Sequence, residues 1–485
     1  MDGRLGRMTD ADARTMDADA TSAAATDEFD IDALVRDHAT EHGIPSVVVG
    51  VVRDGGLASV HATGTRILGE SAAPDADTVY RIASMTKSFT AGAVLLLRDR
   101  GQLRLDDPVV EYLPWLGDRA ISVRDLLTMN AGFPTDDPWG DRHEPTAHET
   151  FQRLVEAGIP RIHEPRGGFE YSNLGYALLG RVISAVDGRE YTEVITDEIL
   201  APLGMRASVF DHRQVPDERA ARGYAPIADG LIEEPRVTPG AFSPMGGLHT
   251  SVRDLSVWVQ GMLDAFLAPE RPHPLAPASR REQQQPANFA RLITRTDDGT
   301  ASAISYGMGL MAEEHSRLGR FVFHSGGYPG FGSHMRWHPA TGTGVIVLSN
   351  RTYGPVLALT ERVICGLVER AEPVTPIRER LWPETAAAID AVESLLTHWD
   401  DEFADALLAH NVDLDQPRAE RAAEWRAVAD AIGTFARDDT SLTSRTPAHA
   451  AWRVTGERGN ARLEVLMSPD FPPRVQHLRA TVDTE

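Results

Sequence analysis

The sequence predicts a mixed fold, α/β of the α+β type, in which an antiparallel sheet carries a helical subdomain and a small C-terminal α+β module follows. Two observations lead to this prediction. Strand patterns lie near both ends of residues 30–370, with helical patterns between them. Beyond residue 384 a second order begins, with helices first and alternating strands afterwards. Strands from both ends of one block can form a single sheet when the helices between them pack to one side.

The first elements follow from short local signals. Asp30 is suited to cap a helix over about residues 31–42, which ends before Pro45. The apolar run 46–52 is typical of a buried strand, and a Gly-rich turn leads to a second strand at 57–63. The apolar run that follows Ser84 predicts a long buried helix over residues 82–101.

The centre of the chain is expected to be helical, and its end to return to strands. Residues 105–250 predict helices and loops, with apolar positions at helical spacing over 175–186. Pro, Arg and Gln dominate residues 268–288, which predicts a mobile insertion. The remaining expected elements are strands at 306–311, 320–324, 332–338 and 344–349 and a helix at about 355–370.

The two ends of the chain differ from this block. Residues 1–29 are rich in Asp, Ala and Thr and lack the apolar stretch of a secretory signal, so we expect a disordered acidic tail and a cytoplasmic protein. Residues 371–384 are expected to be a linker. The module 385–485 carries apolar residues for two helices and three strands, namely Leu395, Trp399, Phe403 and Leu407, then Trp425, Val428, Ile432 and Phe435, then 452–456, 463–467 and 475–482.

Composition excludes several classes of function. The chain has 485 residues with 48 Lys and Arg against 71 Asp and Glu, a net charge of −23, so binding to nucleic acid or to an anionic membrane is not expected. One cysteine excludes an internal disulfide framework. Lys87 is the only lysine, so every other residue in the count of 48 is Arg. A chain that uses Arg almost everywhere has kept Lys at one position.

The segment Ser84-Met-Thr-Lys87 places a hydroxyl and an amine three residues apart at a helix start. Residues i and i+3 share a helix face, so Oγ and Nζ can meet. A serine hydroxyl is a weak nucleophile that needs an adjacent base. Lysine can be that base when burial lowers its pKa, whereas arginine cannot lose its proton. The pattern therefore predicts a nucleophile, Ser84, with a general base, Lys87.

Two further segments add groups that suit the same chemistry. Tyr171-Ser-Asn173 follows a Gly-rich turn, and its phenol could pass a proton while its amide orients Lys87 or a substrate. His324-Ser325-Gly326-Gly327 is expected at a strand end, where glycines let a substrate lie against the strand. The backbone N–H groups of Ser84 and Gly327 could form an oxyanion hole.

These three segments, in this order, resemble the serine β-lactamase and penicillin-recognising family, whose Ser-x-x-Lys, Ser-Asp-Asn and Lys-Thr-Gly triplets define its class A branch. Tyr-Ser-Asn in second place is similar to class C β-lactamases, D,D-peptidases and related esterases. Residues 126–133 and 246–255 also resemble the family. The resemblance covers about residues 30–370 and implies a β-lactamase/transpeptidase-like fold.

The resemblance implies a serine hydrolase that needs no metal or other cofactor. Ser84 would form an acyl-enzyme, Lys87 and Tyr171 would act as base and acid, and Asn173, His324, Ser325 and Gly326 would bind substrate. The family uses Lys at the place of His324 to hold a substrate carboxylate, and histidine is mostly neutral at pH 7. We therefore expect a small ester, amide or D-peptide substrate, with β-lactamase or D,D-carboxypeptidase activity as the alternative.

Other hypotheses remain open at this point. His38-Ala-Thr-Glu41-His42 matches the H-x-x-E-H pattern of zinc peptidases, although a solvated helix face explains it better. A binding protein that keeps the fold without turnover is a third class. Cys365 lies in an apolar helix and is interpreted as a core residue. The C-terminal module resembles NTF2-like domains and leaves open a homo-oligomer formed through it.

Overall fold

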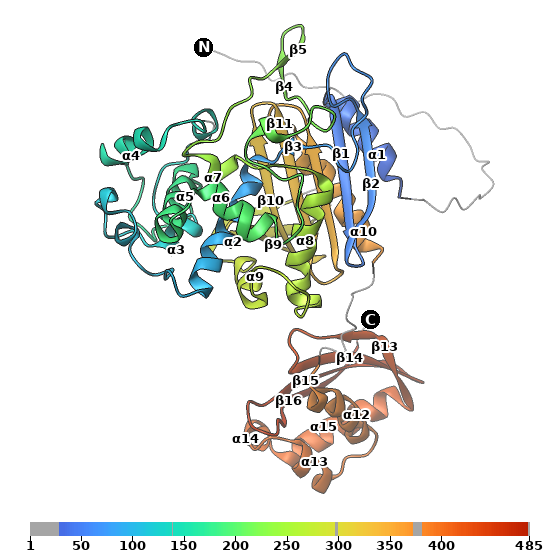
Figure 1. The fold of residues 1–485 in the computed structure, drawn as a ribbon. Coiled ribbons are helices and arrows are strands. Elements are labelled where there is room, and N and C mark those ends of the chain that lie inside the picture. Colours follow the sequence, from blue (N-terminus) through green and yellow to red (C-terminus); the bar gives the residue numbers. More distant parts are fainter. Residues whose placement is uncertain (1–28, 138, 296–298, 372–380, 484–485) are drawn as a thin grey trace, which may run out of the picture.

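The computed structural model describes residues 29–137, 139–295, 299–371 and 381–483. Figure 1 shows two bodies, a large one built from the first three of these ranges and a small one built from the last. The larger body has a β-lactamase/transpeptidase fold, in which an antiparallel sheet and a group of helices lie side by side. The fold class predicted from the sequence is confirmed.

The larger body contains the following strands and helices. The strands are β1 (Ser46–Arg53), β2 (Gly56–Gly64), β3 (Tyr80–Arg81), β4 (Tyr224–Ile227), β5 (Gly230–Glu233), β6 (His249–Thr250), β7 (Asn288–Thr294), β8 (Ala301–Tyr306), β9 (Met311–His315), β10 (Gly319–Tyr328), β11 (Phe331–His338) and β12 (Thr343–Ser349). The helices are α1 (Ile31–Glu41), α2 (Thr86–Asp99), α3 (Val123–Leu127), α4 (His148–Glu156), α5 (Asn173–Asp187), α6 (Tyr191–Ile195), α7 (Ser243–Gly246), α8 (Val252–Leu267), α9 (Pro277–Gln283) and α10 (Val356–Glu369). A 3₁₀ turn, η1 (Ala83–Met85), leads into α2.

The main sheet joins strands from both ends of this body. Its eight strands run in the order β2-β1-β12-β11-β10-β9-β8-β7, all antiparallel, so the strand nearest the N-terminus pairs with β12, with Val49 opposite Val347. Helices α1 and α10 cover one face and α8 covers the other, as Figure 1 shows. Every residue of β1 except Arg53 is buried, which accounts for its continuous apolar sequence.

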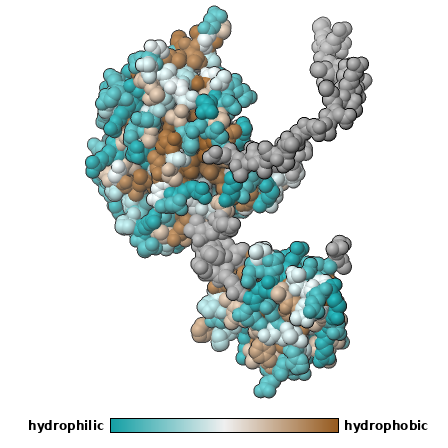
Figure 2. Space-filling view, turned by 90° about the vertical axis from the view of Figure 1, so that its right-hand side faces the viewer, coloured by the Kyte–Doolittle hydropathy of each residue, from teal (hydrophilic) through white to brown (hydrophobic). Residues whose placement is uncertain are grey.

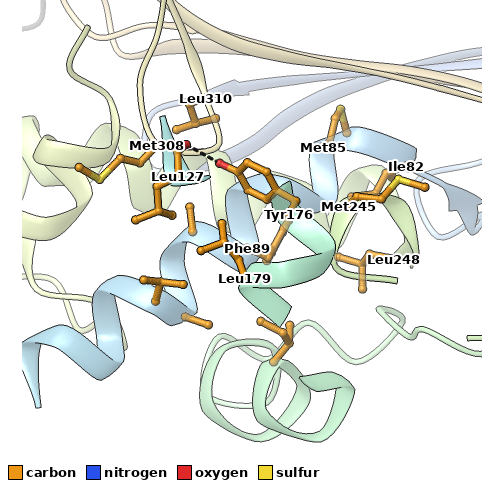
Figure 3. Close-up of a cluster of buried hydrophobic side chains, with 14 of the residues drawn as sticks. Ile82, Met85, Phe89, Leu127, Tyr176, Leu179, Met245, Leu248, Met308 and Leu310 are labelled. Carbon is orange, nitrogen blue, oxygen red and sulfur yellow. Dashed lines mark hydrogen bonds between the residues drawn. The ribbon is translucent and has the colours of Figure 1, made fainter. Parts of the chain in front are cut away.

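A second core lies between the sheet and the helical region, centred on α2 and α5. Figure 3 shows Tyr176 of α5 among side chains from several distant segments, including Met85, Phe89 and Met245. The Tyr176 hydroxyl donates a hydrogen bond to the Leu127 carbonyl oxygen at 2.8 Å. This packed cluster holds the start of α2 in place.

Three sequence expectations for the larger body are wrong in detail, and β7 was not foreseen. The strand expected at 306–311 runs from the last residue of β8 to the first residue of β9, and residues 307–310 between them are not a strand. Residues 268–288 are not a mobile insertion throughout, because α9 packs there with Arg280 buried and with Gln283 donating to the Ser88 carbonyl oxygen at 2.7 Å. Strand β10 continues to Tyr328, so Gly326 and Gly327 lie within the strand and His324 is not at its end.

The C-terminal module has its own sheet and its own core. Its helices are α12 (Pro383–Thr397), α13 (Asp401–Leu407), α14 (Asn411–Asp415) and α15 (Arg418–Ile432), and its strands are β13 (Phe435–Thr443), β14 (His449–Gly456), β15 (Asn460–Met467) and β16 (Val475–Val482). The strands pair in chain order as one antiparallel sheet. Helices α12 and α15 pack on that sheet, and the rings of Trp399 and Trp425 meet edge to face at 5.9 Å.

Two corrections apply to this module. The residues from Leu395 to Leu407 do not form one helix, since α12 ends at Thr397 and Asp400 caps a new helix through a 2.7 Å bond from the Phe403 N–H. Phe435 begins β13 and does not extend α15. The likeness to NTF2-like domains and the homo-oligomer stay predictions. The acidic tail and the linker lie mostly outside the described residues, although Phe29 packs against Gly366 of α10.

No helix in the described ranges is long and apolar enough to cross a membrane. On the face drawn in Figure 2, which is the right-hand side of Figure 1, hydrophobic residues are interspersed with hydrophilic ones. Most large apolar side chains of the described residues lie in three buried clusters, two in the larger body and one in the C-terminal module.

The packing of α5 against α7 gives a matched pair of substitutions. A Cβ on Gly180 would overlap the ring of Pro244, whereas a Cβ on Gly175 would make only an ordinary 3.7 Å contact with Leu126. We expect Gly180→Ala to lower the free energy of unfolding by about 1–3 kcal/mol through overpacking. Gly175→Ala should change it by less than about 1 kcal/mol. Urea unfolding followed by circular dichroism measures both, and equal values for the two variants would contradict this packing.

Candidate active site

Ser84 lies in the turn η1, between strand β3 and helix α2, where the chain is held in an uncommon conformation. Ala83 before it has a φ of 48°, in the left-handed region that residues other than glycine rarely adopt. Such backbone is maintained only by surrounding packing and is common at functional sites. Ser84 is 8% exposed and lines the cavity described below. Its position at the N-terminal end of α2 also favours negative charge.

The amine of Lys87 is fully buried and makes three polar contacts. Its Nζ lies 2.9 Å from Ser84 Oγ, 2.7 Å from Asn173 Oδ1 and 2.8 Å from the carbonyl oxygen of Met245. The last two partners can only accept hydrogen bonds. A neutral amine has two N–H groups and one lone pair, so both N–H groups are used by these acceptors. The lone pair then faces the Ser84 hydroxyl, which is the arrangement that a general base requires.

The charge on Lys87 is set by two opposing effects. Burial lowers the pKa of Lys87 to about 8, since desolvation disfavours the ammonium form. The carboxylates of Asp137, Asp141 and Asp136 oppose this and raise it. Without them, the pKa of Lys87 would be lower still. With them, Lys87 exchanges its proton close to neutral pH, where both a base and a later acid are useful.

Two of these carboxylates also hold Asn173 in place. Asp136 accepts hydrogen bonds from the backbone N–H groups of Asn173 (2.6 Å) and Leu174 (2.8 Å), the first residues of α5. Asp137 accepts a hydrogen bond from Asn173 Nδ2. The amide oxygen is thereby directed to Lys87. Sequence reasoning missed both residues, although an acidic pair after Gly132-Phe-Pro-Thr135 was visible.

Tyr171 lies on the loop before α5 with its ring next to the lysine. Lys87 Nζ is 4.9 Å from the centre of that ring. Burial, followed by the charge of Asp137, raises the pKa of Tyr171 well above its ordinary value, and a hydrogen bond with Ser84 partly opposes this. The phenol is therefore protonated at neutral pH. It can donate a proton in this site, and it is not suited to remove one.

The predicted strand segment lies directly against η1. A Cβ on Gly326 would overlap the Ile82 carbonyl oxygen and the Ser333 hydroxyl, so only glycine allows β10 to approach this closely. The pairing of β10 with β11 continues through Gly327. This approach brings Gly327 and Ser84 to the same cavity, where both contribute to the lining. Their backbone N–H groups are the candidates for an oxyanion hole.

His324 is 3% exposed and electrically neutral. Burial, and then the charge of Lys87, lowers the pKa of His324 to about 3. Its Nδ1 donates to the Ser325 carbonyl oxygen at 2.6 Å. The side chain therefore offers no positive charge to a substrate carboxylate at this place.

A cavity of about 630 Å³ opens beside these residues, a size suited to a small molecule. Ser84, Tyr171 and the carboxylates of Asp137 and Asp141 belong to its lining. Burial, with the charge of Asp137, raises the pKa of Asp141 to about 6, while a 3.0 Å hydrogen bond from the Tyr353 hydroxyl partly opposes this. Apolar side chains, those of Phe169, Ile293, Ile304, Met311, Phe323 and Leu357, also line it, together with the charged side chains of Arg291, Glu313 and Glu361.

The other sequence hypotheses concern residues elsewhere. His38 Nε2 donates to the Pro355 carbonyl oxygen at 3.0 Å, so this nitrogen is occupied and the zinc hypothesis loses one ligand atom. Within the described ranges, no group of three His, Cys, Asp or Glu is placed to hold a metal ion. Cys365 is half-buried on α10, packs beside the core there and has a pKa raised by burial.

Comparison with known proteins identifies the family. The profile described as Beta-lactamase matches residues 31–364, and the chain belongs to this family. Protein flp of Staphylococcus aureus (strain MW2) is 28% identical over 354 residues, which are 70% of this chain and 66% of flp. The chain thus spans just under two thirds of that relative. The D-alanyl-D-alanine-carboxypeptidase/endopeptidase AmpH of Escherichia coli (strain K12) is 27% identical over 318 residues, 62% of this chain and 78% of AmpH.

Solved structures share the fold. The octameric penicillin-binding protein homologue from Pyrococcus abyssi aligns with a TM-score of 0.58 at 22% identity, over 90% of each chain. The D-amino acid amidase from Ochrobactrum anthropi SV3, complexed with L-phenylalanine amide, aligns with a TM-score of 0.58 at 25% identity, over 70% of this chain and 98% of the amidase. The family predicted from the three sequence segments is confirmed.

The pKa of Lys87 predicts the pH dependence of any activity at Ser84. The base form is the neutral amine, which gains population as pH rises through about 8. We expect kcat/KM to fall about tenfold per pH unit below this value and to level off above it. Lys87→Arg is the control, because its guanidinium stays charged; its activity should drop about 10²–10⁴-fold at every pH. Near-full activity in Lys87→Arg would exclude the general-base role.

Asp137 offers a second pH prediction with a definite sign. Its charge is the largest of those that raise the pKa of Lys87. We expect Asp137→Asn to move the midpoint of the pH profile below that of the parent protein. The activity plateau should also fall, because the amide oxygen of the new Asn is a weaker acceptor for Asn173 Nδ2 than the carboxylate it replaces. An upward shift of the midpoint would show that Asp137 does not act on Lys87 through its charge. Asp217→Asn, an exposed change, is the control.

Proposed function

We propose that the chain is a serine hydrolase that cleaves amide or ester bonds of small substrates through an acyl-enzyme on Ser84. The observation that carries this proposal is the set of three contacts around the Lys87 amine. Two acceptors take its N–H groups, which leaves the lone pair for the Ser84 hydroxyl. A serine activated in this way can attack a carbonyl carbon.

The residues divide the reaction among them. Lys87 takes the Ser84 proton as Oγ bonds to the carbonyl carbon, and the Ser84 and Gly327 N–H groups stabilise the resulting oxyanion. Lys87, now charged, returns the proton to the leaving nitrogen or oxygen, either directly or through Tyr171, which donates its phenol proton and takes the Lys87 proton in exchange, so Lys87 is neutral again. Water then attacks the acyl carbon while Lys87 accepts its proton, and Lys87 passes that proton to Ser84 Oγ as the acyl bond breaks and the acid product leaves.

Two features support amides and peptides of D-amino acids as substrates. Neutral His324 gives no cation for a β-lactam carboxylate, so selection for that group is reduced at this place. Relatives named as a D-Ala-D-Ala peptidase and as a D-amino acid amidase act on amide bonds. The apolar side chains in the cavity lining suit an uncharged side chain of such a substrate.

A substrate panel with an active-site variant tests this function. The panel contains D- and L-alanine p-nitroanilide, D-phenylalanine amide, p-nitrophenyl esters and nitrocefin. We expect turnover of the amides and esters with a preference for D over L, slow turnover of nitrocefin, and loss of at least about 10³-fold in Ser84→Ala. Covalent labelling by a fluorophosphonate should disappear in the same variant. Activity that survives Ser84→Ala, or a wild type that neither labels nor turns over any substrate, would reject the proposal.

A further inference from the structure

Ser325 projects its hydroxyl into the cavity from strand β10. Its side chain is exposed and lines the cavity together with Ser84 and Gly327. In the antiparallel register Ser325 lies directly opposite His334 of β11. Residues opposite one another in a sheet present their side chains on the same face. Ser325 Oγ and His334 Nδ1 are accordingly 2.8 Å apart.

His334 is completely enclosed. Its exposed fraction is 0%, and its ring stacks on that of Phe323 with centroids 5.5 Å apart. Burial, followed by the charge of Arg336, holds the pKa of His334 well below its ordinary value. The ring is therefore neutral and carries one N–H. Its other nitrogen, Nε2, has no hydrogen-bond partner among the residues that the structure describes.

The location of the single proton follows from this asymmetry. A proton on Nε2 would be a buried donor without an acceptor, close to a guanidinium, and such donors are rarer than buried acceptors that lack a partner. A proton on Nδ1 is used in the contact with Ser325 Oγ. With the proton on Nδ1, the only group of the ring that lacks a partner within the described residues is Nε2, which is then an acceptor. Ser325 Oγ then accepts a hydrogen bond from His334, and its own O–H is not needed for that contact.

We propose that His334 is a positioning residue that fixes Ser325 as a hydrogen-bond donor to an acceptor oxygen of the substrate. The favoured substrate is an amide or peptide that carries a second carbonyl or carboxylate oxygen beyond the bond that is cleaved. In the described part of the chain, Ser325 Oγ makes no other hydrogen bond, so its proton is free for this contact. The inference rests on the proposed function, because it concerns the same cavity.

A substitution series at position 334 tests this role. His334→Asn can place an N–H near the position of Nδ1, whereas His334→Phe keeps the ring stacking but removes the donor. With D-Ala-D-Ala, which has the second oxygen, we expect His334→Phe to raise KM about five- to tenfold with kcat near wild type. Ser325→Ala should do the same, and the double variant should be no worse than Ser325→Ala alone. His334→Asn should stay within about twofold of wild type.

Three controls give each outcome a meaning. D-alanine amide, without the second oxygen, should respond little to any of these changes. Fluorophosphonate labelling of Ser84 should proceed at the wild-type rate in each folded variant, and if His334→Phe fails to fold, His334→Leu, which also lacks a donor, replaces it. Three outcomes would overturn the positioning role. The KM increases of Ser325→Ala and His334→Phe could multiply in the double variant, kcat alone could fall, or His334→Asn could fail to restore the wild-type KM. A wild type that cleaves neither substrate rejects the proposed function instead.

Discussion

The burial of one amine is the constraint on which the site depends. Taking a lysine ammonium out of water costs several kcal/mol unless other groups compensate for it. Here the compensation comes from segments far apart in the chain: Asn173 at the start of α5, the Met245 carbonyl of α7, and the carboxylates in the segment between α3 and α4. The balance leaves the pKa of Lys87 at about 8. With less burial the pKa of Lys87 would be higher, and without the carboxylates it would be lower.

This constraint explains the unusual distribution of cations in the sequence. Surface positions accept Arg readily, because any cation there forms similar ion pairs, such as the exposed pair of Arg317 with Glu369. The position three residues after Ser84 requires a cation that can lose its proton, and Arg cannot. The single Lys among 48 Lys and Arg therefore marks the position next to Ser84, where the site requires an amine that can lose its proton.

The sequence predicts what local pattern determines. Ser84 and Lys87 are one helical turn apart, and the apolar run of β1 reflects burial on both faces, so both could be identified. Contacts between distant segments could not. Residues 268–288 look like a solvated segment because they are polar, yet Gln283 is buried and donates to a backbone carbonyl of α2. The roles of Asp136 and Asp137 likewise depend on where α5 begins, which the composition of the loop does not show.

The same reasoning connects the stability of the fold to its chemistry. Strand β10 belongs to the main sheet and η1 to the start of the helical region, and they meet because Gly326 lacks a side chain. That contact brings the Gly327 and Ser84 N–H groups to one cavity. The catalytic geometry is therefore a property of the boundary between sheet and helices. A change that separates these two layers by a fraction of an ångström would weaken the oxyanion site before it unfolds either layer, because electrostatic stabilisation depends on donors held at fixed distances.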